Sequence, residues 1–368
     1  MTKILVTGAH FTPAIATIEE IKKYPEIKIV YIGRRNTMEG DKSKSVESEV
    51  LPKLGVKYIP IITGRLQRSF SAYTIPSLLK IPIGFLHAFY IILKENPDAI
   101  LSFGGYVAVP VVFAGWLFSI PIIIHEQTLV SGLANSMSAL LADKIALSFK
   151  QENRFKGENI IITGNPIRQM ILNKSRKFFE HKQPLILITG GNQGSHIINK
   201  TVEECLEKLI NVASIIHVTG NQIQDFEKLE RLQNENYKVK KWIGDDYGSI
   251  LQKVDLVVSR AGANTLTELA YIGKPALVIP IPYLYQHEQI KNAKFFEEQG
   301  LVRILLQSNL SGKTLMENIK WMVKNLPELQ KRAKKAKKVI LPDAAKHLAL
   351  ETYLLARSAA GRAKDKYS

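Results

Sequence analysis

The sequence predicts an α/β protein in which parallel sheets are covered by helices on both faces. Short runs rich in Ile, Val and Leu alternate along the chain with longer segments of helical character. Most of these runs lack polar alternation, which is typical of strands buried on both faces of a parallel sheet. The chain has 368 residues, more than one hydrophobic core usually supports, so we expect two such domains.

The expected strands fall into two groups, separated by a charged stretch that follows Gly164 and Pro166. We expect an N-terminal domain over residues 1–165 and a C-terminal domain over 166–340, with a cleft between the carboxyl ends of their sheets. Residues 341–368 should form a last helix that returns to the first domain and frays at its end. The expected strands are Ile4–Thr7, Lys28–Ile32, Val56–Ile61, Ala99–Phe103, Ile122–His125, Ile145–Ser148, Ile160–Thr163, Leu185–Thr189, Ile215–Thr219, Val239–Trp242, Leu256–Ser259, Ala276–Pro280 and Val302–Leu305.

The composition narrows the class of protein. Fifty Lys and Arg against 33 Asp and Glu give a net charge of +17, which favours an anionic partner. The sequence motifs of nucleic-acid-binding proteins are absent, so we expect an anionic membrane surface and nucleotide ligands, and no nucleic acid. A single cysteine, Cys205, excludes an internal disulfide and suits a reducing cytosol. The chain starts with strand-like MTKILVTG, so we expect no signal peptide.

The uncharged stretch from Ala99 to Ile124 has two interpretations. It is long enough to span a bilayer. However, Gly104–Gly105, Pro110 and Pro121 interrupt it where a strand, a helix and a second strand would meet. We therefore favour a buried strand–helix–strand unit.

Two turns in the second half have features of phosphate sites. In LILITGGNQGS, a strand ends at Thr189 and three glycines lead into a helix, whose first N–H groups and dipole attract anions. In LVVSRAGANTLTE, Arg260 follows a strand, and guanidinium geometry matches phosphate oxygens. Glu268 lies in the next helix, where a carboxylate can accept hydrogen bonds from ribose hydroxyls.

Other polar groups are expected at strand ends. The segment QHEQIKN offers amides and carboxylates of the kind that bind sugar hydroxyls, in a helix expected to start near Gln286. In the first half, SFGGYVAVP, HEQT and TGNPIR place Tyr106, His125 and Arg168 after strands. The first turn, TGAH, carries one glycine and His10. A solvated helix start is the alternative for QHEQIKN, and a structural histidine is the alternative for His10.

Together, these motifs resemble the MurG family of bacterial peptidoglycan glycosyltransferases, from Lys3 to about Leu354. TGAH, SFGGYVAVP, HEQ, TGNPIR, GGNQGS, SRAGANTLTE and HEQIKNA occur in that family's order and spacing. The resemblance implies the GT-B fold, with two Rossmann-like domains facing each other across a cleft. It also implies an inverting hexosyltransferase that moves GlcNAc from UDP-GlcNAc to a polyprenyl-diphosphate-linked sugar, converting lipid I to lipid II.

The resemblance assigns roles by position. It implies that His10 is the catalytic base and that no metal is needed, in line with the absence of a D-x-D triplet from the sequence. The implied donor-binding residues are Arg168, Gly191, Asn192, Gln193, Gly194, Ile243, Arg260, Gly262, Ala263, Thr265, Glu268 and Gln289. The implied acceptor-binding residues are Gly8, His10, Tyr106, His125, Glu126, Gln127 and Thr128.

The chain departs from the family at three of these positions. Its first loop is shorter and poorer in glycine, Thr128 stands where the family has asparagine, and Asn192 stands where it usually has serine. The first two departures concern the acceptor, so another glycolipid or polysaccharide acceptor is the alternative. A nucleotide-sugar epimerase and a non-catalytic sugar-nucleotide-binding scaffold at the membrane are further alternatives.

A lipid acceptor requires contact with a membrane. The segment SAYTIPSLLKIPIGFLHAFYIILK, with Arg65 and Arg68 upstream, combines apolar and basic residues that suit an anionic leaflet. We expect Ile75–Phe85 to be exposed and Ala88–Leu93 to be buried. The basic run Gln330–Lys338 is expected to be a solvated helix face, with attraction to the membrane as the alternative. These features predict a cytoplasmic protein bound peripherally to the inner face of the plasma membrane.

Overall fold

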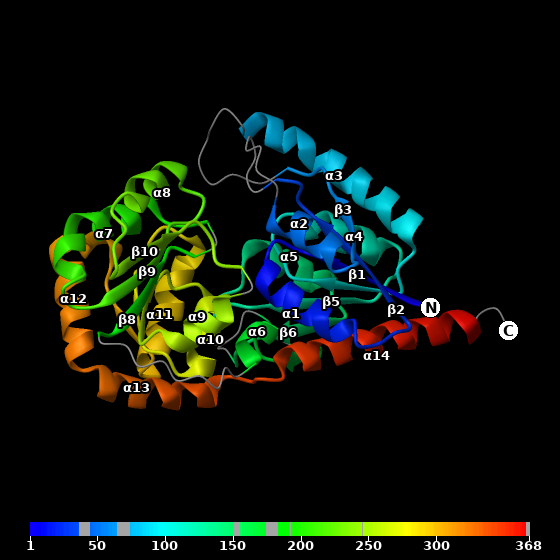
Figure 1. The fold of residues 1–368 in the computed structure, drawn as a ribbon. Helices are drawn as coiled ribbons and strands as arrows, with labels where there is room; N and C mark the ends of the chain where they lie inside the picture. Colours follow the sequence, from blue (N-terminus) through cyan, green and yellow to red (C-terminus); the bar gives the residue numbers. More distant parts are fainter. Residues whose placement is uncertain are drawn as a thin grey trace. The chain divides into compact units, whose positions relative to one another are not determined.

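The computed structural model describes residues 1–36, 45–64, 74–150, 155, 157–173, 183–191, 193–244 and 246–365, and no side chains for residues 74 and 359–365. The chain divides into two units. Unit 1 comprises Met1–Arg168 together with Leu341–Ser368, and unit 2 comprises Gln169–Ile340. Each unit has its own parallel sheet with helices packed on it (Figure 1), which confirms the predicted α/β class.

Within the described residues, the sheet of unit 1 has seven strands in the order β3-β2-β1-β4-β5-β6-β7. All neighbouring strands are parallel, so their carboxyl ends lie along one edge. Each strand lies within two residues of its predicted bounds. The strands are β1 Thr2–Thr7, β2 Ile27–Gly33, β3 Lys57–Pro60, β4 Ala99–Ser102, β5 Ile122–Glu126, β6 Lys144–Leu147 and β7 Ile160–Ile162.

Helices cover both faces of this sheet. Side chains alternate along β1, so Ile4 and Val6 share one core with α1 and α14, whereas Leu5 belongs to the core beneath α3 and α4. The uncharged stretch of residues 99–124 is β4, α4 and β5, as predicted. The helices of unit 1 are α1 Phe11–Ile21, α2 Val46–Lys53, α3 Thr74–Glu95, α4 Ala108–Leu117, α5 Leu133–Ser138, the 3-10 helix η1 Ala139–Leu141, and α14 Ala344–Asp365.

The last helix, α14, belongs to unit 1 although it follows unit 2 in the sequence. Figure 1 shows α14 (red) beside α1 (blue), and the two helices are in contact. The rings of Tyr24 and Tyr353 stack with their centroids 4.8 Å apart. Lys144 and Glu351 form an ion pair of 2.6 Å. These contacts tie the end of the chain to the first sheet.

Within the described residues, the sheet of unit 2 has six parallel strands in the order β10-β9-β8-β11-β12-β13. Its core joins Ile186 and Ile188 of β8 to apolar residues of α7 and α12. The strands are β8 Leu185–Thr189, β9 Ser214–Val218, β10 Tyr237–Lys240, β11 Leu256–Ser259, β12 Ala276–Val278 and β13 Val302–Ile304. The helices are α6 Gln169–Leu172, α7 His196–Leu209, α8 Ile223–Glu230, α9 Tyr247–Lys253, α10 Ala263–Ile272, η2 Tyr285–His287, α11 Glu288–Glu298, η3 Gln307–Asn309, α12 Gly312–Lys324, α13 Leu326–Lys335 and η4 Ala336–Val339.

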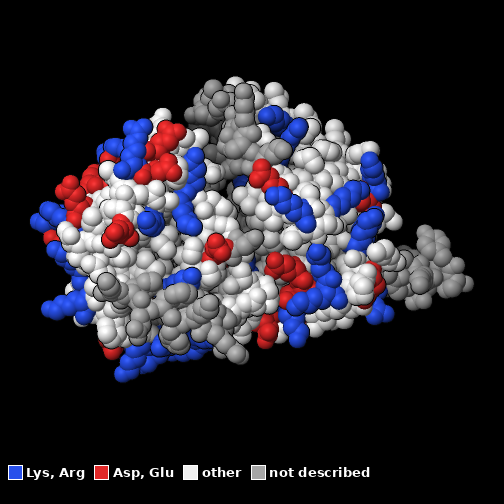
Figure 2. Space-filling model, viewed as in Figure 1, with Lys and Arg blue, Asp and Glu red and all other residues white. Residues whose placement is uncertain are grey.

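Helix α3 exposes an apolar stripe. Leu79 and Leu86 are 68% and 71% exposed, and Figure 2 shows mainly uncharged (white) atoms over this helix. Of the segment Ala88–Leu93, predicted to be buried, Ala88, Ile91 and Ile92 are buried, but Tyr90 and Leu93 are exposed. The prediction was wrong for these two because a helix with one face on the sheet turns the intervening positions to solvent.

By length and composition alone, α3 is also sufficiently apolar to cross a membrane. Within Ile75–Glu95, an 18-residue stretch has a mean hydropathy of 1.6, and 28% of this stretch is buried in the protein. The buried face is that of a core helix, since it packs on the sheet and on α4.

Candidate active site

The candidate site residues of unit 1 lie at or just after the carboxyl ends of β1, β4 and β5, at one edge of the sheet, where ligands of parallel sheets bind. The first turn starts at Gly8, whose φ of 143° and close packing on Phe103 leave no room for a Cβ. The N–H of Ala9 donates to the Gly104 carbonyl at 2.9 Å. His10 is the N-cap residue of α1. Glycine is therefore needed at position 8 for packing.

His10 lies at the start of α1 with an exposed side chain. The surrounding protein and, second, the positive charge of Arg34 lower the pKa of His10, although part of the imidazole surface is in contact with water. The charge of His10 in turn acts on His125. A neutral imidazole is the form that accepts a proton, as a general base must.

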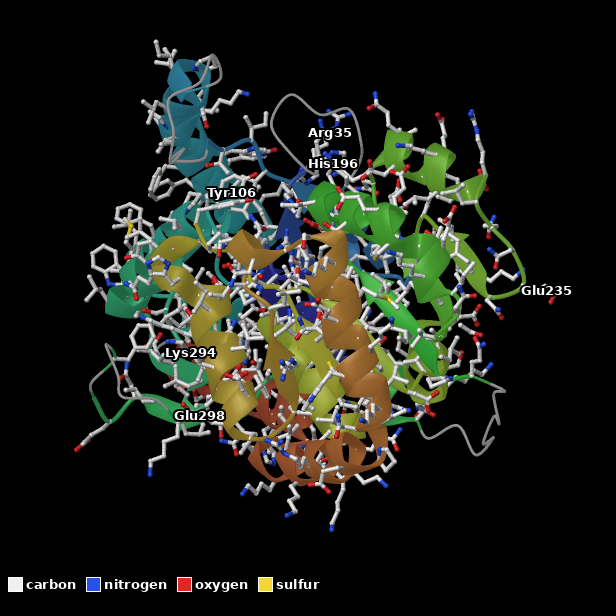
Figure 3. All side chains as sticks on the ribbon, turned by 90° about the vertical axis from the view of Figure 1, so that its left-hand side faces the viewer. Arg35, Tyr106, His196, Glu235, Lys294 and Glu298 are labelled. Atoms are coloured by element: carbon white, nitrogen blue, oxygen red, sulfur yellow. The ribbon has the colours of Figure 1, made fainter. Side chains whose placement is uncertain are left out.

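A second turn, after β4, packs against the first. Gly104 and Gly105 have φ values of 68° and 82°. A Cβ on Gly105 would lie 2.5 Å from the Cβ of Ala9, and one on Gly104 would lie 2.4 Å from Oδ1 of Asn135. Tyr106, labelled in Figure 3, follows this turn. Its side chain is half-buried. The glycines thus let the turns after β1 and β4 lie against each other.

Glu126, at the end of β5, organises the loop that follows it. One carboxylate oxygen accepts hydrogen bonds from the N–H (3.1 Å) and hydroxyl (2.9 Å) of Thr128. The other accepts from the N–H of Gly132 (3.2 Å) and Nδ2 of Asn135 (3.0 Å). Burial raises the pKa of Glu126, and these hydrogen bonds oppose the rise. Glu126 and Thr128 therefore hold the loop in place from within the protein.

Three buried polar atoms near this loop have no hydrogen-bond partner among the described residues. They are Nδ1 of His125, Oε1 of Gln127 and Oδ1 of Asn135. Buried polar atoms are almost always paired in folded proteins, so such a group indicates a place for a ligand or water. Sequence reasoning missed Asn135, although an asparagine nine residues after Glu126 on the next helix was a visible signal.

In unit 2, the first candidate turn follows β8. Gly191 has a φ of 84°, and its N–H donates to Oγ1 of Thr189 at 3.2 Å. The N–H of Gly194 donates to the Gly191 carbonyl at 3.0 Å. Gln193 is exposed, and Asn192 lies outside the described residues. The turn leads directly into α7, whose first residue is His196 (Figure 3).

Arg260 follows β11 and is 8% exposed. Its two terminal nitrogens donate to the Ile279 carbonyl at 2.9 Å and to Oγ of Ser195 at 2.8 Å. Burial lowers the pKa of Arg260. The side chain thus joins the ends of β11 and β12 to the N-cap of α7, so it positions the turn after β8.

The turn after β11 leads directly into α10. Gly262 is the N-cap, with φ −70° and ψ 137°, and a Cβ there would meet no atom of the described residues within 4 Å. The protein itself does not require glycine here, so the close approach of a ligand is a reason for it. Ala263 and Thr265 lie in the first turn of α10. Glu268 lies one turn further and is 2% exposed.

The turn before α11 is strained. Gln286 and His287 have φ values of 51° and 55°, which non-glycine residues rarely adopt. Helix α11 begins directly after them at Glu288, two residues from the predicted start near Gln286. Oε1 of Gln289 accepts from the N–H of Ile281 at 3.1 Å. Nδ2 of Asn292 donates to the Ala261 carbonyl at 3.3 Å, and its Oδ1 has no partner among the described residues. This turn is therefore fixed beside the one that contains Gly262.

Two further predicted donor residues lie outside these turns in the sequence. Ile243 follows β10 and is 9% exposed, and Arg168 is the last residue of unit 1. Among the described residues, no group of three or more His, Cys, Asp and Glu side chains is arranged to hold a metal ion.

Comparison with known proteins identifies the family of the chain. Residues 7–147 match the glycosyltransferase family 28 N-terminal domain, and residues 185–348 match the glycosyltransferase family 28 C-terminal domain. The chain belongs to glycosyltransferase family 28. A family 28 transferase has the two-sheet GT-B fold, as the resemblance implied.

Two curated relatives extend the match over most of the chain. A protein from Clostridium kluyveri is 34% identical over 87% of this chain and 91% of its own length. One from Bacillus cytotoxicus is 34% identical over 93% of this chain and 95% of its own. Both are named UDP-N-acetylglucosamine--N-acetylmuramyl-(pentapeptide) pyrophosphoryl-undecaprenol N-acetylglucosamine transferase. A crystal structure of Acinetobacter baumannii MurG superposes with a TM-score of 0.71 at 24% identity, covering 96% of this chain and 99% of that one.

Proposed function

We propose that this family 28 protein is a UDP-GlcNAc-dependent hexosyltransferase that converts lipid I to lipid II in peptidoglycan synthesis. The observation that carries this conclusion is the 34% identity to N-acetylglucosamine transferases of that name over nearly the full length of both chains. The sheet edges of both units supply groups suited to the two substrates.

The reaction is a single displacement at the anomeric carbon. An acceptor hydroxyl oxygen forms the new C–O bond as the bond to UDP breaks, so the configuration inverts. The hydroxyl proton passes to His10, whose lowered pKa keeps the imidazole neutral and able to accept it. A positioned general base of this kind typically contributes roughly 10²–10⁴-fold to the rate.

The leaving diphosphate develops negative charge that needs stabilising. Helices α7 and α10 both start at glycine-containing turns, and their N-terminal N–H groups favour an anion there. Arg260 fixes the first of these turns through Ser195. Preorganised dipoles of this kind stabilise charge without a metal, and the sequence has no D-x-D triplet, so the proposed reaction uses no metal cofactor.

The acceptor sugar is assigned to the loop after β5 in unit 1. Buried acceptor atoms of Gln127 and Asn135 and the unpaired Nδ1 of His125 suit hydroxyl and amide hydrogens of a sugar. A site that leaves such atoms unpaired without its substrate discriminates strongly against analogues that lack the matching group.

The exposed apolar surface of unit 1 is proposed to bind the membrane. Besides the stripe on α3, Trp116, Leu117 and Phe118 at the end of α4 are exposed, and the ring centroids of Phe89 and Phe118 lie 5.7 Å apart. Lys80 and Lys94 on α3 add positive charge suited to an anionic leaflet. This arrangement supports peripheral attachment to the inner face of the plasma membrane, where a lipid-linked acceptor is reached.

The test is UDP release from UDP-GlcNAc with and without lipid I at low detergent. Acceptor-dependent release with a GlcNAc-extended lipid product supports the proposal. Release that requires a different glycolipid would identify another acceptor, which is the alternative suggested by the short first loop and by Thr128 in place of an amide. Binding of UDP-GlcNAc without release, or its epimerisation without acceptor, would overturn the proposal. Adding EDTA should leave the rate unchanged.

A further inference from the structure

The edge of the unit 1 sheet contains an ion pair to which neither the sequence motifs nor the proposed reaction gives a role. Arg34 directly follows β2, the strand that pairs with β1. Its Nε donates to Oε1 of Glu47 at 3.0 Å. The Glu47 side chain is 2% exposed and that of Arg34 24%, so the pair is largely removed from water.

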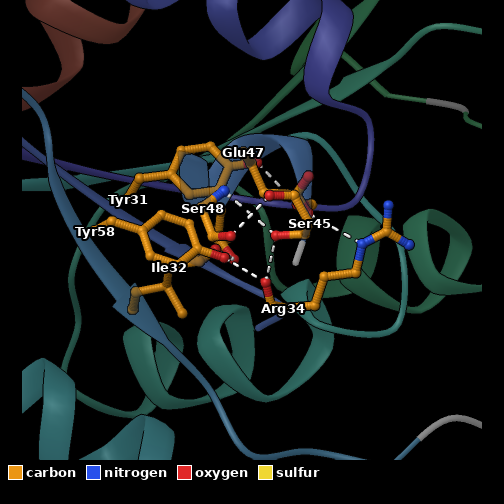
Figure 4. Close-up of polar contacts among 9 residues, drawn as sticks. Tyr31, Ile32, Arg34, Ser45, Glu47, Ser48 and Tyr58 are labelled. Carbon is orange, nitrogen blue, oxygen red and sulfur yellow. Dashed lines mark hydrogen bonds and ion pairs between the residues drawn. The ribbon is translucent and has the colours of Figure 1, made fainter. Parts of the chain in front are cut away.

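The backbone of Arg34 is hydrogen-bonded to its neighbours, as its side chain is (Figure 4). Its carbonyl accepts hydrogen bonds from Oγ of Ser45, at 2.7 Å, and from the hydroxyl of Tyr58. Ser45 is also the N-cap of α2, the helix that carries Glu47. Figure 4 shows the two terminal nitrogens of the guanidinium pointing away from Glu47. The pair therefore fixes the direction of the guanidinium.

This network is joined to the turn that carries His10. The hydroxyl of Tyr31 donates to the Gly8 carbonyl at 2.9 Å, and the rings of Tyr31 and Tyr58 stack with centroids 5.9 Å apart. Oγ1 of Thr7 donates to the Ile32 carbonyl at 3.0 Å. The Arg34 charge also contributes to the lowered pKa of His10. Arg34 therefore acts on the same edge of the sheet as the proposed base.

The first turn itself offers few donors for an anion. The Ala9 N–H is already bonded to Gly104. Proline at position 13, in the first turn of α1, has no N–H. This turn therefore has fewer backbone donors for an anion than a glycine-rich turn, so a nearby cationic side chain would strengthen the site.

We propose that Arg34 is the anion-binding side chain of unit 1, held by Glu47 to take the diphosphate of the lipid-linked acceptor. Guanidinium groups match phosphate oxygens with paired hydrogen bonds, and a partner carboxylate removes the entropy cost of orienting the side chain. Glu47 is a positioning residue because it acts through Arg34. The inference rests on the proposed function for the identity of the acceptor.

The first experiment measures steady-state constants for the full chain with each substrate varied in turn. For Arg34→Gln we expect the KM for lipid I to rise about tenfold or more, while the KM for UDP-GlcNAc stays within about twofold. Glu47→Gln should raise the acceptor KM less, and Arg34→Lys should recover part of the loss. Arg35→Gln is the matched control, because it removes the same charge from the neighbouring exposed residue and should leave both constants unchanged.

A second experiment is independent of catalysis. Titration calorimetry compares the binding of farnesyl diphosphate, farnesyl monophosphate and inorganic pyrophosphate to wild type and to Arg34→Gln. Weaker binding of both diphosphates to the variant supports the proposal, even if lipid I is not the acceptor and the proposed function fails. Unchanged binding and acceptor KM, equal losses for both substrates, or an equal effect of Arg35→Gln would overturn it, because Arg34 would then only join α2 to β2.

Discussion

A buried histidine in each unit illustrates the difference between a structural polar group and a site. Burial lowers the pKa of both His125 and His217 to about 4, so both are neutral at pH 7. In His217, Nδ1 is bonded to the Tyr237 hydroxyl at 2.9 Å and Nε2 to Oδ1 of Asn199 at 3.1 Å. In His125, Nε2 lies 3.1 Å from the Gly164 carbonyl, but Nδ1 has no partner among the described residues.

The contrast shows that burial and a shifted pKa do not by themselves indicate function. The His217 network is satisfied, and a satisfied buried network stabilises and rigidifies the fold around it. His125 lies beside further unpaired atoms, those of Gln127 and Asn135, at the carboxyl edge of its sheet. A cluster of buried polar atoms without hydrogen-bond partners destabilises the protein without substrate. A bound substrate that supplies these hydrogen bonds removes that cost.

The largest expected effect concerns His10, the exposed histidine whose charge acts on His125. We expect His10→Ala to lower kcat by roughly 10²–10⁴-fold, because the acceptor hydroxyl loses its base. The Kd for UDP-GlcNAc should stay within about threefold, since the donor turns lie in unit 2. Steady-state rates and calorimetry measure the two quantities. Equal losses in turnover and donor binding, or wild-type turnover, would contradict the assignment.

The comparison itself is tested by replacing each buried histidine with phenylalanine. His125→Phe should lower kcat/KM for the acceptor by roughly 10–100-fold, because phenylalanine has no ring nitrogen in the place of Nδ1 to bind the substrate. His217→Phe should instead lower the free energy of unfolding by about 2–4 kcal/mol, because Tyr237 and Asn199 lose their partner. Urea unfolding and steady-state kinetics on the same two proteins measure both effects. If both variants lose stability and activity alike, the distinction drawn from the unpaired nitrogen is wrong.

The fold was predictable from the sequence because its signals are local. Continuous apolar runs such as residues 122–124 identify buried parallel strands whatever their neighbours are, and each expected strand is present. The exposure of Tyr90 and Leu93 was not predictable, because it depends on which face of α3 meets the sheet.

The candidate site was predictable only in part. Strand-end motifs indicated the turns that contain Gly8, Gly191 and Gly262, because the carboxyl ends of parallel strands share an edge. Asn135 and the Arg34–Glu47 pair were missed, because each contact joins side chains of two different elements, and the sequence does not determine which way those side chains point. Arg260 was predicted to face a phosphate. Its bonds to Ile279 and Ser195 depend on side-chain direction, which spacing along the chain does not determine.

The two buried histidines should have the same effect on how the free energy of unfolding depends on pH. Their folded pKa values of about 4 lie below the unfolded value of 6.5, so between these pH values the unfolded state binds more protons. The free energy of unfolding therefore falls as pH drops from about 6.5 to 4, by at most about 3 kcal/mol for each histidine. Urea unfolding at several pH values gives the unfolding free energy as a function of pH. This free energy should depend less steeply on pH in His217→Gln and in His125→Gln than in the wild type. An unchanged slope in both would show that neither histidine is held neutral.

The smallest expected effect extends the comparison to glycines. Gly262 has an ordinary φ of −70° and open space around its missing Cβ, whereas a Cβ on Gly190 would lie 2.3 Å from the Ser195 nitrogen. Gly262→Ala should therefore leave the unfolding free energy unchanged or raise it by up to about 1 kcal/mol. The KM for UDP-GlcNAc should still rise about 3–10-fold, because the methyl group occupies space that the donor needs. Gly190→Ala is the matched control and should destabilise the protein. If the Gly262→Ala protein is stable and its KM for UDP-GlcNAc is unchanged, the open space at the start of α10 does not bind the donor. Gly262 would then have no ligand-binding role, as we conclude for His217.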